Sequence, residues 1–158
     1  MPTLEESLLI DASLADVWDY YFEPRGWPAW VDGFHALSSA QGYPGEGGSL
    51  VWRSNPAGRG TVTERVLEHQ PRRRHRIEFS DPESQGELLT RFEIEGERTR
   101  VTLSYDYGLR RGGPFAWLTE RLFVRGQVRA SLQRSLLRFK HEAEEVATLG
   151  DPIRHAPS

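Results

Sequence analysis

The longest regular pattern in the chain is a row of apolar residues near the C-terminus, bounded by glycine- and proline-containing segments. Positions three and four residues apart are mostly apolar, and the positions between them carry charges such as Glu120, Arg138 and Glu142. This spacing predicts one amphipathic helix over residues 114–147, which would be roughly 51 Å long. A helix of this length needs a curved surface to lie in. The row consists of Phe115, Leu118, Leu122, Arg125, Arg129, Leu132, Leu136, Phe139, Ala143 and Val146.

Upstream of this helix, the hydrophobic pattern predicts a strand, two short helices and then six more strands. Ser13 is a candidate N-cap for a helix over 14–22, with Asp16 completing a capping box. Pro24 ends that helix, and Pro28 suits the first turn of a second one. The turns between the strands are short, so consecutive strands are expected to pair as antiparallel neighbours. The expected strands cover residues 3–11, 34–40, 48–55, 58–69, 73–80, 86–96 and 99–108.

One face of the predicted sheet is apolar but also carries large rings and polar groups. Alternation places Glu64 between Val62 and Val66, and it places His75 on the face of Ile77. A close-packed core favours Leu, Ile and Val, whereas rings with scattered polar groups are typical of a ligand pocket. Taken singly each residue also fits a structural role; taken together they favour a cavity. The candidate lining residues on the strands are Trp52, Glu64, His75, Thr90, Tyr105 and Tyr107.

The helical segments supply further candidates for the cavity wall. Trp27 and Trp30 either plug a corner of the core or line the cavity mouth. Arg125 and Arg129 interrupt the apolar row beside Gly126, which lowers helix propensity by about 1 kcal/mol relative to alanine. We therefore expect the first half of the long helix to roof the cavity and to bend near the glycine. Trp117 and Leu122 complete the candidate lining residues.

Composition restricts the class of protein. At 158 residues the chain fits one domain, expected over 1–149 and followed by a tail over 150–158. With 37% hydrophobic residues it is not disordered, and its net charge of −3 argues against nucleic acid as a partner. The absence of cysteine excludes disulfides and thiolate chemistry. No signal peptide and no membrane span are visible, so we expect a cytoplasmic monomer or homodimer.

Two segments carry a resemblance to a known superfamily. They are IDASLADVWDYYFEPRGWPAWVDGF at 10–34 and SLQRSLLRFKHEAE at 131–144. The chain resembles the START/Bet v 1-like (SRPBCC) superfamily, especially its bacterial polyketide cyclase/dehydrase-like branch. The resemblance implies an α+β helix-grip fold, in which a seven-stranded antiparallel sheet wraps around a long C-terminal helix. It also implies a cavity between them for lipids, polyketides or aromatic compounds.

The residues and the resemblance leave three functions open. The first is binding of a small apolar or aromatic molecule, lipid or polyketide-like, in the cavity. The second is a polyketide cyclase or dehydratase without a cofactor, in which His75 or Glu64 transfers protons. In that case Arg125 or Arg129 would hold an enolate oxygen or a ligand carboxylate; otherwise these arginines pair with Glu64 or lie in solvent. The third is an interaction module that docks a partner through a sheet edge or the long helix.

The sequence contains no recognised metal or nucleotide motif. No histidine stands at a recognised ligand spacing with a carboxylate or a second histidine, so no metal and no cofactor are expected. The glycine-rich segment at 42–48 lies between predicted strands and is therefore expected to be a hairpin loop. The histidines are His35, His69, His75, His141 and His155.

Overall fold

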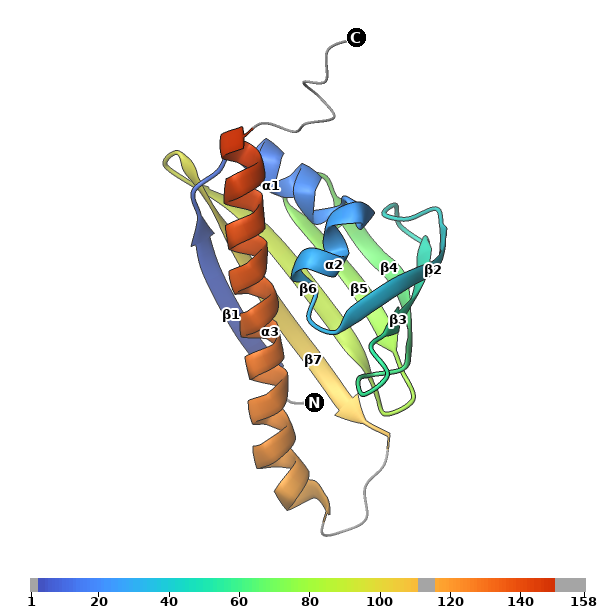
Figure 1. Ribbon diagram of the computed structural model, residues 1–158. Coiled ribbons are helices and arrows are strands. Elements are labelled where there is room, and N and C mark those ends of the chain that lie inside the picture. The colour runs from blue at the N-terminus through green and yellow to red at the C-terminus, as the bar shows by residue number, and fades with distance from the viewer. Residues whose placement is uncertain (1–2, 111–115, 150–158) are drawn as a thin grey trace.

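A computed structural model describes residues 3–110 and 116–149 of the chain, with side chains described from residue 123 onward in the second range. Figure 1 shows a curved sheet with one long helix lying across it. The sheet has seven antiparallel strands in the order β1-β7-β6-β5-β4-β3-β2, so the predicted sheet and its meander are confirmed. The elements are β1 Thr3–Ile10, α1 Leu14–Tyr21, η1 Pro24–Gly26, α2 Trp27–Trp30, β2 Phe34–Gln41, β3 Ser49–Ser54, β4 Thr61–Gln70, β5 Arg74–Ser80, β6 Ser84–Glu95, β7 Arg98–Leu109 and α3 Ala116–Leu149.

Local sequence signals account for most of the element boundaries. The Oγ atom of Ser13 accepts a 3.2 Å hydrogen bond from the backbone N of Asp16, which confirms the predicted N-cap of α1. Pro24 opens the short 3-10 helix η1 instead of simply ending α1. The glycine-rich segment at 42–48 is the loop between β2 and β3, where Gly42 and Gly47 have φ angles of 66° and 79°.

Two predicted boundaries differ or lie outside the description. The predicted strand over 58–69 begins only at Thr61, because the backbone N of Gly58 donates to the Asn55 carbonyl at 2.8 Å and closes a turn. The first residues of the predicted long helix, at 114–115, and the tail at 150–158 lie outside the described residues. From Ala116, α3 runs as one continuous helix through Gly126.

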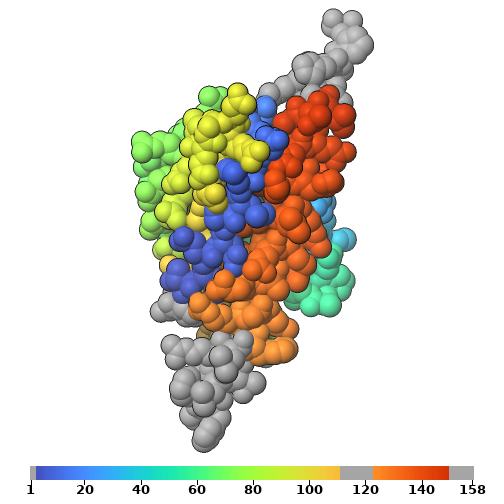
Figure 2. Space-filling view, turned by 90° about the vertical axis from the view of Figure 1, so that its left-hand side faces the viewer, coloured from blue at the N-terminus to red at the C-terminus, as the bar shows by residue number. Residues whose placement is uncertain are grey.

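The C-terminal half of helix α3 packs against the inner face of the sheet. Leu136, Phe139 and Ala143 are buried, as the apolar row predicts. The same helix runs beside β1, and Figure 2 shows the two elements side by side at the surface. There the Nζ atom of Lys140 donates a 3.0 Å hydrogen bond to the carbonyl of Leu9. The long helix is therefore fastened to both the core and the edge strand.

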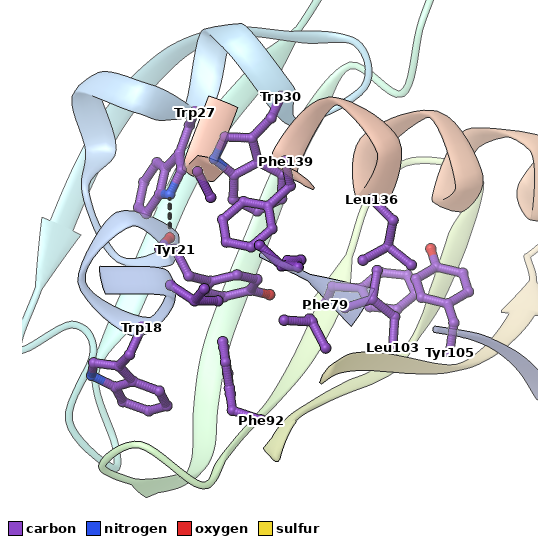
Figure 3. Close-up of a cluster of buried hydrophobic side chains, with 14 of the residues drawn as sticks. Trp18, Tyr21, Trp27, Trp30, Phe79, Phe92, Leu103, Tyr105, Leu136 and Phe139 are labelled. Atoms are coloured by element: carbon purple, nitrogen blue, oxygen red, sulfur yellow. Dashed lines mark hydrogen bonds between the residues drawn. The ribbon is translucent and has the colours of Figure 1, made fainter. Parts of the chain in front are cut away.

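Aromatic side chains of α1 and α2 close one end of the core. Figure 3 shows the indole of Trp27 donating to the backbone carbonyl of Tyr21, at 2.9 Å. The ring of Phe139 from α3 lies 4.8 Å from that of Trp30 and 5.6 Å from that of Tyr21. Along most of the sheet the predicted alternation holds. Ile94, near the β6–β7 turn at Gly96, is an exception with 66% exposure, and Thr102 is another, because it is buried although it alternates with Val101 and Leu103.

Candidate functional site

A cavity of about 440 Å³ lies between the inner face of the sheet and helix α3. Its volume is within the range of roughly 300–1,000 Å³ that small-molecule sites occupy. Val124, Val128 and Leu132 of α3 line one side, so among the described side chains the middle of the helix roofs the cavity. The remaining wall is largely aromatic and apolar. It includes Trp27, Trp30, Phe34, Tyr43, Leu50, Trp52, Ile77, Phe79, Leu88, Leu103, Tyr105 and Tyr107.

Glu64 is a carboxyl group on the sheet floor of this cavity. It lies between Leu50 on β3 and Phe79 on β5 in the register of the sheet. The indole Nε1 of Trp52 donates a 2.6 Å hydrogen bond to its Oε2 atom. Burial raises the pKa of Glu64 above its usual value, and neither the Trp52 hydrogen bond nor the charge of Arg59 offsets this effect. A carboxyl tuned in this direction suits proton transfer closer to neutral pH.

Arg59 is the cationic side chain at the same end of the cavity. Its Nε atom donates to Oδ2 of Asp81 at 2.8 Å. Its guanidinium lies over two rings of the sheet floor, 5.0 Å from the ring centre of Phe79 and 5.7 Å from that of Trp52. Burial raises the pKa of Asp81, but hydrogen bonds from Arg59 and the β5–β6 turn bring it below its usual value. The carboxyl group of Asp81 is therefore ionised at neutral pH.

His75 lines the cavity farther along β5. It lies four residues from Phe79, which is roughly 13 Å at the rise of a strand. Its ring is 2% exposed, and its Nδ1 atom is 2.9 Å from Nδ1 of His69, so one ring donates and the other accepts. Burial and the neighbouring His69 lower the pKa of His75 to about 3, so the imidazole is neutral at pH 7. A base this weak is poorly suited to abstracting protons at neutral pH.

Three buried nitrogen atoms of cavity-lining residues have no hydrogen-bond partner in the part of the chain that the structure describes. They are Nε1 of Trp30, Nη2 of Arg59 and Nε2 of His75. Buried polar atoms in folded proteins are nearly always hydrogen-bonded, so unpaired ones at a cavity are candidates for contact with a ligand. The cavity is therefore apolar along its length and polar at a few points.

Comparison with known proteins identifies the family. A family model described as "Polyketide cyclase / dehydrase and lipid transport" matches residues 1–144. The chain belongs to this family. The resemblance predicted from the segments at 10–34 and 131–144 is thereby confirmed. No curated protein matches the sequence.

Several solved structures share the fold of this polyketide cyclase/dehydrase family member. The Zhui aromatase/cyclase from a Streptomyces species matches with a TM-score of 0.75 and 18% identity, over 99% of this chain and 98% of that one. The di-domain ARO/CYC StfQ of the steffimycin biosynthetic pathway matches with a TM-score of 0.74 and 16% identity, over 92% of this chain and 51% of that one. A Thermus thermophilus protein matches with a TM-score of 0.70 and 19% identity, over 92% and 99%. At these identities the likeness shows the helix-grip fold alone.

Most of the site residues predicted from the sequence line the cavity of this chain. Those that line it are Trp27, Trp30, Trp52, Glu64, His75, Tyr105 and Tyr107. Thr90 is fully buried but does not line the cavity, because its hydroxyl is hydrogen-bonded to the Tyr21 hydroxyl at 2.8 Å. The side chains of Trp117 and Leu122 lie outside the described residues.

The expectation that Arg125 and Arg129 face the cavity is wrong. The Nη1 atom of Arg129 donates to Oε1 of Glu6 at 2.6 Å, and the Nη2 atom of Arg125 lies 3.4 Å from the Thr3 carbonyl. Both partners belong to β1, because these positions of α3 face the edge strand and not the sheet floor. The predicted alternative partner was also wrong, since the carboxylate is that of Glu6 and not that of Glu64.

Sequence reasoning missed Arg59, Asp81 and Tyr43 as cavity residues. All three lie in or next to turns, where the period of the strands gives no information on the direction of a side chain. The sequence feature that could have pointed to Arg59 is its position in the short turn segment NPAGRG, directly before an apolar strand.

One group of potential metal ligands lies on the outer surface of α3. His141, Glu142 and Glu145 have ligand atoms within 4.8 Å of one another, a proximity that the sequence reading did not find. The His141 side chain is 78% exposed, and clusters of this kind are common without a metal. Among the described residues, no helix is long and apolar enough to cross a membrane.

Proposed function

We propose that the chain binds a small aromatic molecule in the cavity between the sheet and α3. The observation that carries this proposal is a 440 Å³ cavity whose walls are mainly rings and aliphatic side chains. Rings of this kind favour flat aromatic ligands, because they offer large apolar faces in fixed orientations. Phe79 and Tyr105 show how firmly these rings are held, since they stack on each other 4.9 Å apart with planes only 7° from parallel.

The polar atoms of the wall support a ligand that carries oxygen atoms. The Nε2 atom of His75 and the Glu64 carboxyl stand at separate points of an otherwise apolar surface. Burial raises the pKa of Tyr105 to about 12, so its hydroxyl remains a neutral donor at physiological pH. A phenol or a polyketide-like molecule supplies oxygens that such groups can bind, whereas a pure hydrocarbon does not.

Binding is tested by isothermal titration with 2-naphthol, a two-ring phenol. Val128→Trp places a large ring in the cavity roof, and Leu137→Trp makes a similar insertion at a position on α3 that is 62% exposed and does not line the cavity. We expect 2-naphthol to bind the wild-type protein and Leu137→Trp, and not Val128→Trp. Equal binding by both variants would show that the ligand lies elsewhere.

A second candidate function is cyclisation of a polyketone, favoured by the raised pKa of Glu64. As a carboxylate, Glu64 would take a proton from a methylene between two carbonyl groups. The resulting enolate would attack a ketone of the same chain, forming a carbon–carbon bond, and the new alkoxide would recover the proton from Glu64. This cycle needs no cofactor, and general acid–base catalysis of this kind contributes typically 10²–10⁴-fold.

The two functions are separated by turnover of a poly-β-ketone. Glu64→Gln keeps the size of the side chain but removes its proton transfer, so cyclisation should slow by about 10²-fold or more. Glu78→Gln is the matched control, because Glu78 pairs with Arg65 and does not line the cavity. Unchanged turnover in Glu64→Gln, with binding intact, would leave a binding protein without this catalysis.

A further inference from the structure

Arg59 occupies a position from which it can reach a ligand. It belongs to the turn between β3 and β4, at one end of the sheet, but its guanidinium extends back over the inner face. There it covers the rings of Trp52 and Phe79, both of which line the cavity, as Arg59 itself does. The cation therefore lies at the boundary between the cavity and its surroundings.

Asp81 holds this guanidinium in place. Four donors surround its two carboxylate oxygens: Nε of Arg59 at 2.8 Å, the backbone N of Glu83 at 2.9 Å, the backbone N of Ser84 at 2.7 Å and the Ser84 hydroxyl at 2.8 Å. With its acceptor sites occupied in this way, Asp81 fixes one edge of the guanidinium. Positioning of this kind is what a preorganised recognition site requires.

The other edge of the guanidinium lacks a partner. The Nη2 atom is buried, and no acceptor among the described residues reaches it. An arginine side chain stays protonated at any physiological pH, so this nitrogen keeps its donors whether or not a ligand is present. No ion pair joins Arg59 to Glu64 in the described part of the chain, where its ionic partner is Asp81.

The charged groups around this end of the cavity allow an anion to bind there. Asp81 is committed to its four donors, and exposed Glu83 is the other acidic residue of this turn that lines the cavity. A second cation, Arg110, lies against the same turn, with its Nε atom donating to the Asp81 carbonyl at 3.0 Å. Glu64 is a third acidic residue near Arg59, and burial favours its protonated form because it raises the pKa of Glu64. Of the two arginines, Arg59 is the one that combines a cavity position with an unpaired buried donor among the described residues.

We propose that Arg59 binds the carboxylate of an aromatic acid whose ring system lies in the cavity. This inference rests on the proposed binding function and adds to it the chemical class of the ligand. Arginine donors match a carboxylate in geometry and charge, and hydrogen bonds between ionised groups are stronger than those between neutral ones. The rings of Phe79 and Trp52 lie beside the guanidinium, at the place where the attached aromatic group would enter the cavity.

The test uses three probes with one ring system: 2-naphthoate, 2-naphthol and 2-naphthylmethylammonium. They are titrated at pH 7.5 into the wild-type protein, Arg59→Gln and Arg65→Gln. Arg65 is the matched control, because it is an arginine of β4 that pairs with Glu78 and does not line the cavity. We expect Arg59→Gln to weaken 2-naphthoate at least tenfold and 2-naphthol less than threefold, with neither changed in Arg65→Gln.

The wild-type titrations keep the proposal testable if Arg59→Gln loses its fold. The wild-type protein should bind 2-naphthoate at least tenfold more tightly than 2-naphthylmethylammonium, which carries the opposite charge on the same ring. Equal affinities for the two ions, or equal loss of 2-naphthoate and 2-naphthol in folded Arg59→Gln, would overturn the role of Arg59 while leaving the binding function in place. Failure of all three probes to bind would contradict the binding function itself.

Discussion

Phe139 is the residue at which the packing of α3 is best tested. Its side chain is 1% exposed, and its ring lies within 5.7 Å of those of Tyr20, Tyr21 and Trp30. A phenylalanine ring buries on the order of 150–250 Å², which corresponds to about 4–6 kcal/mol at 25 cal/mol per Å². Alanine retains part of this burial, so Phe139→Ala should lower the free energy of unfolding by about 4 kcal/mol.

The loss is measured by urea denaturation followed by far-UV circular dichroism, which reports on the whole sheet and helix. The midpoint of thermal unfolding should fall by roughly 8–16 °C, at 2–4 °C per kcal/mol for a chain of this size. Phe123→Ala is the matched control on the same helix, since Phe123 is 65% exposed, and its effect should stay within about 0.5 kcal/mol. Equal effects of the two substitutions, or a loss below about 1 kcal/mol in Phe139→Ala, would refute the proposed packing of α3.

Two further predictions concern pH and helix continuity. The pKa of His75 is about 3 in the folded chain and near 6.5 when the chain is unfolded. Between these pH values the imidazole is protonated only in the unfolded chain. The free energy of unfolding is therefore highest above pH 6.5 and falls as the pH drops towards 3. The fall between pH 6.5 and 4.5, measured by urea midpoints, should therefore be smaller in His75→Gln, and exposed His141→Gln should behave as wild type. Gly126→Ala should raise the free energy of unfolding by about 1 kcal/mol, because an added Cβ meets no atom within 4 Å and alanine favours the helix. A destabilised Gly126→Ala in thermal unfolding would indicate that α3 needs flexibility at this position.

The candidate site was predictable in its strand residues and not in its turns. Alternation alone placed Trp52, Glu64, His75 and Tyr105 on one face, because successive side chains of a strand point to opposite sides. Arg59 was not predictable in this way, since its turn directs the side chain back over the sheet. The pKa of Glu64 depends on burial by neighbours that the sequence alone does not bring together.

The sequence by itself determined the elements of the fold and the long amphipathic helix, because apolar period and turn residues act locally. It also predicted the buried residues Leu136, Phe139 and Ala143 of α3, although Leu132 and Val146 of the same row are only partly buried. Only the tertiary structure decided that Arg129 would pair with Glu6, since both the cavity and β1 lie beside the first half of the helix. A helical period tells which residues share a face, and the neighbour of each face is set by how the sheet curves around the helix.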